Sequence, residues 1–519
     1  MNSKMKRILY AFALILALAC VLISCNSSDL PEETTATTPE ETTTTTPEET
    51  TPEAPEEKFP TSQGLAYEVN SDGKTCTVIG IGTCVESNVY VGGYIDGYKV
   101  IAIGDEAFRE CNQKSIMIGD SVTSIGKWAF LLSSNLTKVT IPDSVTTIGD
   151  EAFRFCSALT RIVVDGDNAA YKSISGNLYS KDGTVLLTYA IGKQSESFVI
   201  PDSVTTIGSS AFASCFSLTS VIIGDSVTTI GSSAFYNCVR LEHVTIPNSV
   251  TIIDSCAFAW CDNLTSVKIP DLVTTIGDEA FRSCSKLTSI TIPDSVTNIG
   301  NRAFEGCSKL TSVTIGTAVT SIGNDAFWSC SNLDSVYIYD IIKWCDISFS
   351  NYRANPLSNV VDLYLVKNDS PELIVDFVIP DSVDVIKDYA FAGCKNLTSV
   401  MIPNSVTTIG NGAFHNCNNL TSITIADSVT TIGDEAFCFC NRLTSITIPS
   451  SVTAIGQNAF GFCFDLASVN FITPNGWWYA SEADATSGTA ISAADLSVPT
   501  TATRYLKGTY SDYYWYRTE

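Results

Sequence analysis

A unit of 23 residues recurs along most of this chain, and no other feature of the sequence constrains the fold as much. An Ala-Phe pair marks every copy. The spacing is 23 residues, apart from one interval of 22 and two insertions. A repeat of this length predicts a solenoid, in which each coil contacts only its neighbours. Thirteen copies are present, with Phe108, Phe130, Phe153, Phe212, Phe235, Phe258, Phe281, Phe304, Phe327, Phe391, Phe414, Phe437 and Phe460.

Three short segments make up each coil. Leu-Thr-Ser-Val-Thr-Ile, at residues 310–315, ends in polar-apolar alternation and is rich in β-branched residues, so it predicts a strand. Val-Thr-Thr-Ile, at residues 273–276, predicts a second extended piece. It is ended by Gly in eleven of thirteen copies, and we expect that Gly to take a positive φ. Residues 278–284 predict a helix of at most about two turns.

A single coil cannot bury its own Leu, Val, Ile, Ala and Phe side chains. Stacked coils place each residue over its equivalent and form continuous apolar columns. The sequence therefore predicts a repeat solenoid, α/β in class but leaning to β, of about thirteen 23-residue coils with parallel strands and short helical turns.

The combination of this period with the recurring Ala-Phe, Gly and Cys resembles the BspA-type leucine-rich repeat over residues 100–471. The resemblance implies a right-handed curved solenoid. It also implies a bacterial cell-surface protein that adheres to host, matrix or neighbouring-cell proteins. It specifies no ligand, because no binding motif defines the family.

The N-terminus has three basic residues, an apolar run at residues 8–23, and then Leu22-Ile23-Ser24-Cys25. This segment resembles a bacterial lipobox. The resemblance implies a signal peptide at residues 1–24, lipid on Cys25, and anchoring at the extracellular face of the cell envelope. The alternatives are modification at Cys20, which fits the pattern less well, and an uncleaved membrane anchor.

Residues 25–60 are rich in Thr, Pro and Glu and poor in apolar residues, so we expect a disordered, extended stalk.

Solenoid ends need caps, which we expect at residues 61–99 and in the aromatic segment 472–519. Insertions near residues 165–197 and 339–376 interrupt the array, and the first contains an Asp-Gly turn that predicts a hairpin. They act either as struts between sub-arrays or as protruding recognition elements.

Most of the nineteen cysteines lie three residues after a repeat Phe, which places them in one column that we interpret as packing. Cys76 and Cys84 lie outside the column, and either a disulfide or free thiols fit their spacing. We expect no metal site and no cofactor, because no Cys-x-x-Cys or His pairing accompanies the column. Asp165, Asp167 and Asn168 resemble half of a calcium loop, although a turn explains them equally well.

The chain has only two histidines, which leaves few residues from which a His-based catalytic site could be built. We therefore expect no catalytic residues. His415 and Cys438 each follow their repeat Phe in adjacent coils. A Cys-His nucleophile is conceivable there, but no orienting residue or oxyanion hole accompanies the pair. The formal net charge of −25 makes nucleic acid an unsuitable partner.

The outward strand position is mostly Thr, varied by Lys268, Tyr337 and Met401. We expect an adhesive surface that binds a protein or glycan on a host, matrix or neighbouring cell, with membrane contact only through the lipid on Cys25. The alternatives are a structural envelope protein without a soluble ligand and an ice-binding threonine ladder. Aromatic residues dominate interface energetics, so the candidate binding residues are Tyr337, Trp344, Trp477, Trp478, Tyr513, Tyr514 and Trp515, for which cap packing is the competing explanation.

Overall fold

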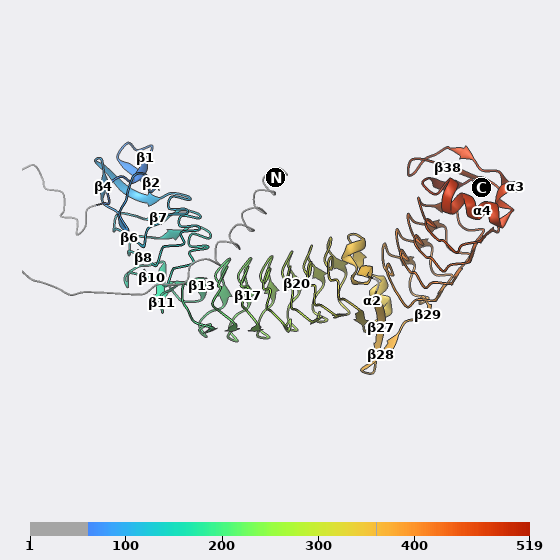
Figure 1. Ribbon diagram of the computed structural model, residues 1–519, viewed down its shortest axis with the longest axis horizontal. Helices are drawn as coiled ribbons and strands as arrows, with labels where there is room; N and C mark the ends of the chain where they lie inside the picture. Colours follow the sequence, from blue (N-terminus) through green and yellow to red (C-terminus); the bar gives the residue numbers. More distant parts are fainter. Residues whose placement is uncertain (1–60, 360, 519) are drawn as a thin grey trace, which may run out of the picture. The chain divides into compact units, whose positions relative to one another are not determined.

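The computed structural model describes residues 61–359 and 361–518, which belong to one compact unit. The predicted repeat solenoid is confirmed. Coils stack on one another, and the strands of successive coils pair mainly in parallel (Figure 1). The stack has about 17 turns, more than the number of Ala-Phe pairs, because the insertions and terminal segments contribute further coils.

The first ladder of strands comes from the Leu-Thr-Ser-Val-Thr-Ile segments and is divided into several short sheets. Strands of neighbouring coils supply each other's backbone hydrogen bonds. In chain order the strands are β3 (Asn88–Val91), β6 (Ser115–Ile118), β8 (Lys138–Ile141), β10 (Arg161–Val164), β14 (Ser197–Val199), β16 (Ser220–Ile222), β18 (His243–Thr245), β21 (Ser289–Thr291), β23 (Ser312–Ile315), β25 (Ser335–Ile338), β27 (Asp362–Lys367), β28 (Ser370–Leu373), β29 (Asp376–Val378), β31 (Ser399–Ile402), β33 (Ser422–Ile425), β35 (Ser445–Ile448) and β37 (Ser468–Phe471).

The second ladder contains the Val-Thr-Thr-Ile segments together with strands from the two ends and the insertions. Its strands are β1 (Ala66–Val69), β2 (Thr75–Gly80), β4 (Tyr94–Ile95), β5 (Tyr98–Ile103), β7 (Ser124–Ile125), β9 (Thr147–Ile148), β11 (Tyr171–Ile174), β12 (Asn177–Ser180), β13 (Val185–Thr188), β15 (Thr206–Ile207), β17 (Thr229–Ile230), β19 (Ile252–Ile253), β20 (Thr275–Ile276), β22 (Asn298–Ile299), β24 (Ser321–Ile322), β26 (Ser348–Phe349), β30 (Val385–Ile386), β32 (Thr408–Ile409), β34 (Thr431–Ile432), β36 (Ala454–Ile455), β38 (Trp477–Ala480), β39 (Thr489–Ala490) and β40 (Tyr514–Arg517).

The third side of each coil is a run of turns, so the predicted short helix is wrong. Within residues 278–284, Glu279 and Ser283 have φ values of 57° and 56°, which a right-handed helix excludes. The N–H groups of Glu279, Phe281 and Ser283 donate to carbonyl oxygens of the next coil at 2.7, 2.8 and 2.7 Å. In this segment, therefore, every second backbone N–H donates to a carbonyl of the next coil, whereas in a helix it would donate to a carbonyl of the same segment.

The glycine after the second strand also differs from expectation, because none of these repeat glycines has a positive φ. At Gly300, a Cβ atom would lie 2.5 Å from the backbone nitrogen of Asp278 and 2.6 Å from the carbonyl carbon of Gly277. Glycine is required here because adjacent coils approach closely. The left-handed conformation falls instead two residues later, as at Arg302.

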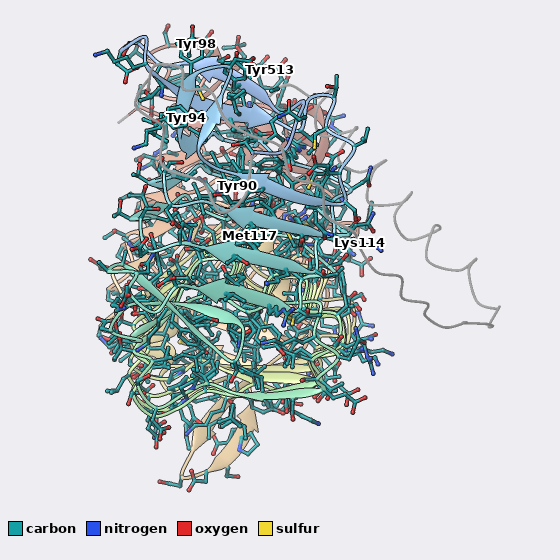
Figure 2. All side chains as sticks on the ribbon, turned by 90° about the vertical axis from the view of Figure 1, so that its left-hand side faces the viewer. Tyr90, Tyr94, Tyr98, Lys114, Met117 and Tyr513 are labelled. Carbon is teal, nitrogen blue, oxygen red and sulfur yellow. The ribbon has the colours of Figure 1, made fainter. Side chains whose placement is uncertain are left out.

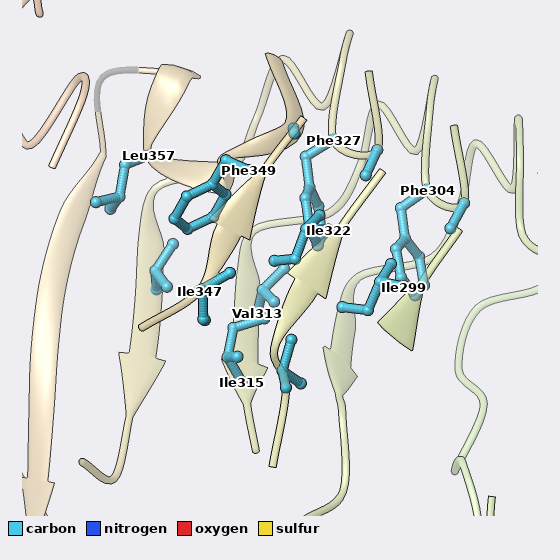
Figure 3. Close-up of a cluster of buried hydrophobic side chains, with 14 of the residues drawn as sticks. Ile299, Phe304, Val313, Ile315, Ile322, Phe327, Ile347, Phe349 and Leu357 are labelled. Atoms are coloured by element: carbon cyan, nitrogen blue, oxygen red, sulfur yellow. The ribbon is translucent and has the colours of Figure 1, made fainter. Parts of the chain in front are cut away.

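The core consists of columns of equivalent apolar side chains. Phe281 and Phe304 stack with ring centroids 5.5 Å apart, and Phe304 and Phe327 stack at 5.3 Å. Figure 3 shows this column beside Ile299 and Ile322, which belong to β22 and β24. Burying each such side chain contributes about 1.5–3 kcal/mol, so the stacking of coils stabilises the fold.

The cysteine column packs in the core, as predicted, and it also forms hydrogen bonds between coils. The thiol of Cys284 donates to the carbonyl oxygen of Phe258 at 3.2 Å, and the thiol of Cys307 donates to Phe281 at the same distance. Equivalent bonds join other coils along the array. Each thiol is therefore a second donor to a buried carbonyl that already accepts a backbone N–H of its own coil, as Phe258 O does from Cys261 at 3.3 Å.

The first insertion continues the stack. Asp182 and Gly183 turn the chain between β12 and β13, which pair antiparallel as the predicted hairpin does, and β13 then pairs parallel with β15. Tyr189 stacks on Phe212 at 5.1 Å and so extends the phenylalanine column.

The second insertion contains α2 (Ile341–Cys345) and two 3₁₀ turns, η1 (Tyr352–Ala354) and η2 (Pro356–Asn359). Trp344 Nε1 donates to the carbonyl oxygen of Ala390 at 2.9 Å, and Asn355 Nδ2 donates to the carbonyl of Tyr389 at 2.6 Å. These contacts join the insertion to the following coil, and Asn351 Nδ2 joins it to the preceding coil by donating to Asp325 Oδ1 at 3.0 Å, so the insertion links the two as a strut. Its β27–β28 hairpin projects from the stack (Figure 1).

Both ends of the described chain are covered. At the N-terminal end, β1 pairs antiparallel with β2, which is parallel to β5. At the C-terminal end, β40 pairs antiparallel with β36 and covers the last second-ladder strand. The remaining C-terminal helical elements are α3 (Ala493–Leu496), α4 (Pro499–Arg504), which packs against β37, and the π-helical turn η3 (Tyr505–Thr509).

Candidate binding surface

One side chain of each first-ladder strand points outward between two inward-facing residues. In β23, Thr314 lies between buried Val313 and Ile315, and the register places Thr291 and Tyr337 beside it on the neighbouring strands. This position defines the strand-face row. Its members are Tyr90, Met117, Thr140, Val163, Val199, Ile222, Thr245, Lys268, Thr291, Thr314, Tyr337, Tyr364, Val378, Met401, Thr424, Thr447 and Asn470.

The strand-face row exposes apolar side chains in adjacent pairs. Val199 and Ile222 are paired across β14 and β16 and are 61% and 53% exposed. Val378 and Met401 are paired across β29 and β31 and are 56% and 51% exposed. Figure 2 labels Tyr90 and Met117, which are paired across β3 and β6. Exposed apolar groups collected at one position of a sheet are typical of an interaction surface.

Tyr337, a predicted binding residue, lies in this row on β25. Its ring stacks on Tyr364 of β27 at a centroid distance of 5.1 Å and an interplanar angle of 22°. Both residues are half-buried, so each keeps part of its surface exposed. A stacked aromatic pair of this kind offers a flat contact area with little conformational entropy to lose on binding.

The threonines of the row do not form an uninterrupted ladder. Lys268, Tyr337 and Tyr364 separate the threonine runs, and the apolar pairs occupy the same position elsewhere. An ice-binding surface requires a regular threonine lattice, which this row does not provide.

Three of the predicted binding residues are buried. Trp344, Trp477 and Trp515 are each 2% exposed or less. Trp477 Nε1 donates to Thr473 O at 2.9 Å, and Trp515 Nε1 donates to Tyr510 O at 3.0 Å. These side chains pack the strut and the C-terminal cap, in line with the packing explanation, and present no surface to a ligand.

Trp478, Tyr513 and Tyr514 are half-buried in the same cap. The ring of Trp478 lies 4.8 Å from that of Tyr516, and the ring of Tyr513 lies 4.9 Å from that of Tyr479. They form the outer layer of the cap's aromatic cluster and lie apart from the strand-face row.

A cleft of about 470 Å³ beside the cap was missed by sequence reasoning. Phe462 and Phe464 line it and are exposed, while Arg504 and Lys507 approach from α4 and η3. Lys507 Nζ donates to the carbonyl oxygen of Leu466 at 2.7 Å, so this ammonium is already engaged. A signal was present in the sequence at Phe464, since most other coils carry a polar residue at that position.

The possible calcium loop is a turn. Asp165 Oδ1 accepts the N–H of Asp167 at 2.9 Å, and buried Asn168 donates to the carbonyl oxygens of Pro142 and Val145. The Asn168 side-chain oxygen accepts two backbone N–H groups, so its hydrogen-bonding capacity is used within the turn.

Cys76 and Cys84 are buried free thiols, and Cys76 Sγ lies 3.7 Å from the carbonyl oxygen of Tyr98.

His415 and Cys438 lie close together in adjacent coils, and Glu435 lies beside them. His415 Nδ1 lies 3.2 Å from Glu435 Oε2. Burial lowers the pKa of His415, although the Glu435 carboxylate opposes the shift.

A comparison with protein families matches the BspA type leucine rich repeat region over residues 97–185, 188–271, 251–360 and 370–475, which together cover well over half of the chain. The chain belongs to the BspA-type leucine-rich repeat family. This assignment agrees with the repeat length and with the columns of Phe, Cys and Gly in the structure.

Several solved structures are similar to this BspA-type chain. A leucine-rich repeat protein from Bacteroides ovatus is 29% identical, with 80% of this chain and 94% of that chain covered and a TM-score of 0.47. A protein from Faecalibacterium prausnitzii, described as a leucine rich cell surface protein, is 26% identical, with 81% and 96% covered and a TM-score of 0.29. The pneumococcal vaccine antigen PcpA is 19% identical, with 70% and 84% covered and a TM-score of 0.37. No curated protein matches the chain.

The lipobox, Cys25 and the Thr/Pro/Glu-rich segment of this BspA-type chain lie outside the described residues. Within residues 61–359 and 361–518, no helix has the length and apolar character needed to cross a membrane.

Proposed function

We propose that this protein is a lipid-anchored cell-surface binding protein that mediates adhesion through its strand-face row. The observation that carries this proposal is the set of exposed apolar pairs at one register position, above all Val199 with Ile222 and Val378 with Met401. The family assignment supports a surface-binding role.

The chemistry of the row favours an extracellular protein partner. Aliphatic side chains gain about 1.5–3 kcal/mol each when a partner removes them from water, and a flat sheet allows several to be covered together. The Tyr337–Tyr364 stack adds an aromatic surface that also fits the face of a sugar ring, so a glycan is the second partner class.

We place no catalysis in this function, and the binding reaction needs no cofactor. The membrane contact is the lipid on Cys25, with residues 25–60 as a stalk that holds the solenoid away from the membrane. Replacing Cys25 with Ser should release the protein from the membrane fraction. Unchanged fractionation of the Cys25→Ser variant would contradict lipid anchoring without affecting the binding proposal.

The binding proposal can be tested with residues 61–519, presented to host matrix proteins, cell-wall material, neighbouring bacteria and glycan arrays. A triple variant, Val199→Thr, Ile222→Thr and Met401→Thr, introduces the residue that other coils carry at this position, so the fold should tolerate it. We expect affinity for the protein partner to fall at least tenfold.

Ile252→Thr is the matched control, because Ile252 is an exposed apolar residue of the second ladder. Equal binding by the triple variant and the wild type would overturn the assignment of the surface. Absence of any partner at micromolar concentrations would favour a structural envelope role, for which deletion of the protein alters wall integrity and leaves adhesion unchanged.

A further inference from the structure

A histidine, a carboxylate and a thiol meet on the turn side of two adjacent coils near the C-terminal end. His415 follows the repeat Phe of one coil, and Cys438 occupies the equivalent position of the next. Glu435 lies three residues before Cys438 in the same turn. One ligand atom from each of these three side chains lies within 4.8 Å of the other two.

The surroundings of Glu435 differ from those of the same residue in other coils. Where Glu occupies this position elsewhere, an Arg follows three residues later and pairs with it, as Arg154 does with Glu151 at 2.9 Å and Arg282 with Glu279 at 2.9 Å. In the Glu435 coil that position is Cys438. The carboxylate instead faces His415 of the preceding coil, at 3.2 Å from Nδ1.

The same positions of the flanking coils hold small residues. Ala392 precedes His415 in the column and Gly461 follows Cys438, so no bulky side chain of the column crowds the group from above or below. The ring of Tyr352 covers one side, with its centroid 5.0 Å from the imidazole, and the ring of Phe439 lies 5.6 Å from it. Cys438 is 2% exposed and Glu435 is 53% exposed, so the group is enclosed on one side and open to solvent on the other.

We propose that His415, Glu435 and Cys438 bind one divalent transition-metal ion, for which Zn²⁺ is the best match. Zn²⁺ bonds of about 2.0–2.3 Å to N, O and S place tetrahedral ligand atoms roughly 3.3–3.8 Å apart. The His415–Glu435 separation of 3.2 Å lies just below this range, and a thiol within 4.8 Å needs a shift of about 1 Å. Sulfur and imidazole ligands favour Zn²⁺ over Ca²⁺ and Mg²⁺.

Binding requires the thiolate of Cys438, so one proton leaves the thiol for solvent as the Zn–S bond forms. The imidazole coordinates the ion in its neutral form. A water molecule completes the coordination on the exposed side of Glu435. The ion would link two consecutive coils through their side chains and does not depend on the adhesive function.

The test uses residues 61–519 titrated with Zn²⁺ against a competing chelator, and with Co²⁺ as a spectroscopic probe. We expect one equivalent of Zn²⁺ and a sulfur-to-cobalt charge-transfer band. Cys438→Ser should abolish this band, and His415→Ala and Glu435→Gln should weaken Zn²⁺ binding at least tenfold. Cys256→Ser and His243→Ala are matched controls that should leave it unchanged.

Glu435→Gln separates the loss of a metal ligand from the loss of the fold, because the Glu435 side chain is half exposed and the substitution is nearly isosteric. The proposal is overturned by retention of the cobalt–sulfur band in Cys438→Ser. It is equally overturned by wild-type protein that holds no Zn²⁺ at micromolar free metal, since the three side chains would then be only an ion pair beside a thiol.

Discussion

Ser133 Oγ donates a hydrogen bond to the carbonyl oxygen of Phe108 over 2.6 Å, at the position where the following coils carry cysteine. Cysteine and serine therefore perform the same task between coils. Each position of the column takes a small side chain that can donate a hydrogen bond. This requirement explains why free thiols recur without forming disulfides.

Substitutions of Cys284 test this explanation. Cys284→Ser should retain the bond to Phe258 and change the free energy of unfolding little. Cys284→Ala should destabilise the chain by about 0.5–1.5 kcal/mol, because it removes the thiol's hydrogen bond to Phe258 O and leaves that carbonyl only the N–H of Cys261. Urea unfolding of both variants provides the comparison, and equal losses would show that the thiol acts by volume alone.

Thiol reactivity should follow burial. Desolvation raises the pKa of the column thiols, to about 12 for Cys330 and Cys394, so they stay protonated and unreactive in the native chain. Cys256 is only partly buried and should react first with an alkylating agent at pH 8. Mass spectrometry of native and urea-unfolded samples gives the order, and early labelling of Cys330 would contradict the structure.

Glu151 should make stability depend on pH in the acid range. Burial acts to raise the pKa of its carboxyl, but hydrogen bonds from Ser210 and Trp128 and the charge of Arg154 outweigh it and lower the pKa. The stabilisation is therefore present above the unfolded value of about 4.3 and is lost as pH falls through the lower folded pKa.

Melting temperatures of wild type and Glu151→Gln between pH 7 and 3 check this expectation. The variant should be less stable than wild type at pH 7 and should lose less stability on acidification. Parallel curves for the two proteins would show that the carboxylate has no such role.

Trp344 should couple the coils on either side of the second insertion. Trp344→Ala removes a buried ring and its bond to Ala390, so we expect a loss of about 3–5 kcal/mol. Trp328→Ala serves as control, because Trp328 is exposed and stacks against Arg353, and its loss should be about 1 kcal/mol or less. If urea unfolding gave similar losses of unfolding free energy for the two variants, Trp344 would not couple the coils.

Gly300 should not accept a methyl group. Gly300→Ala brings a Cβ atom to 2.5 Å from the backbone of the preceding coil, so the coils must separate and the melting temperature should fall by several degrees. Gly166→Ala is the control, since nothing lies within 4 Å of its Cβ position. A neutral effect at Gly300 would show that the coils are less closely packed than the structure indicates.

The repeat period predicted the stacking, the strands and the buried columns, because equivalent side chains such as Phe281 and Phe304 must meet when coils stack. It did not predict the conformation of residues 278–284. Local helix propensity there competes with hydrogen bonds to the next coil, and bonds such as Glu279 N–H to Asn301 O are absent from any single unit. The role of Gly300 was missed for the same reason.

The candidate surface was only partly predictable. Tyr337 was identified because it departs from the threonines around it, and the structure places it beside Tyr364 in the strand-face row. Trp344, Trp477 and Trp515 could not be separated from exposed aromatics by sequence, because the same residue type fills cores and interfaces. The contact of Glu435 with His415 depends on an offset between coils that spacing alone does not give.

The bond between Cys284 and Phe258, like the equivalent thiol bonds between repeat coils, joins a coil to its immediate neighbour. An in-frame duplication or loss of 23 residues of the gene inside the array would therefore create a junction chemically equivalent to those already present. Evolution can lengthen or shorten this protein one coil at a time, while the caps at the two ends stay the same. The outward-facing residues of each coil can also be substituted independently of those in other coils.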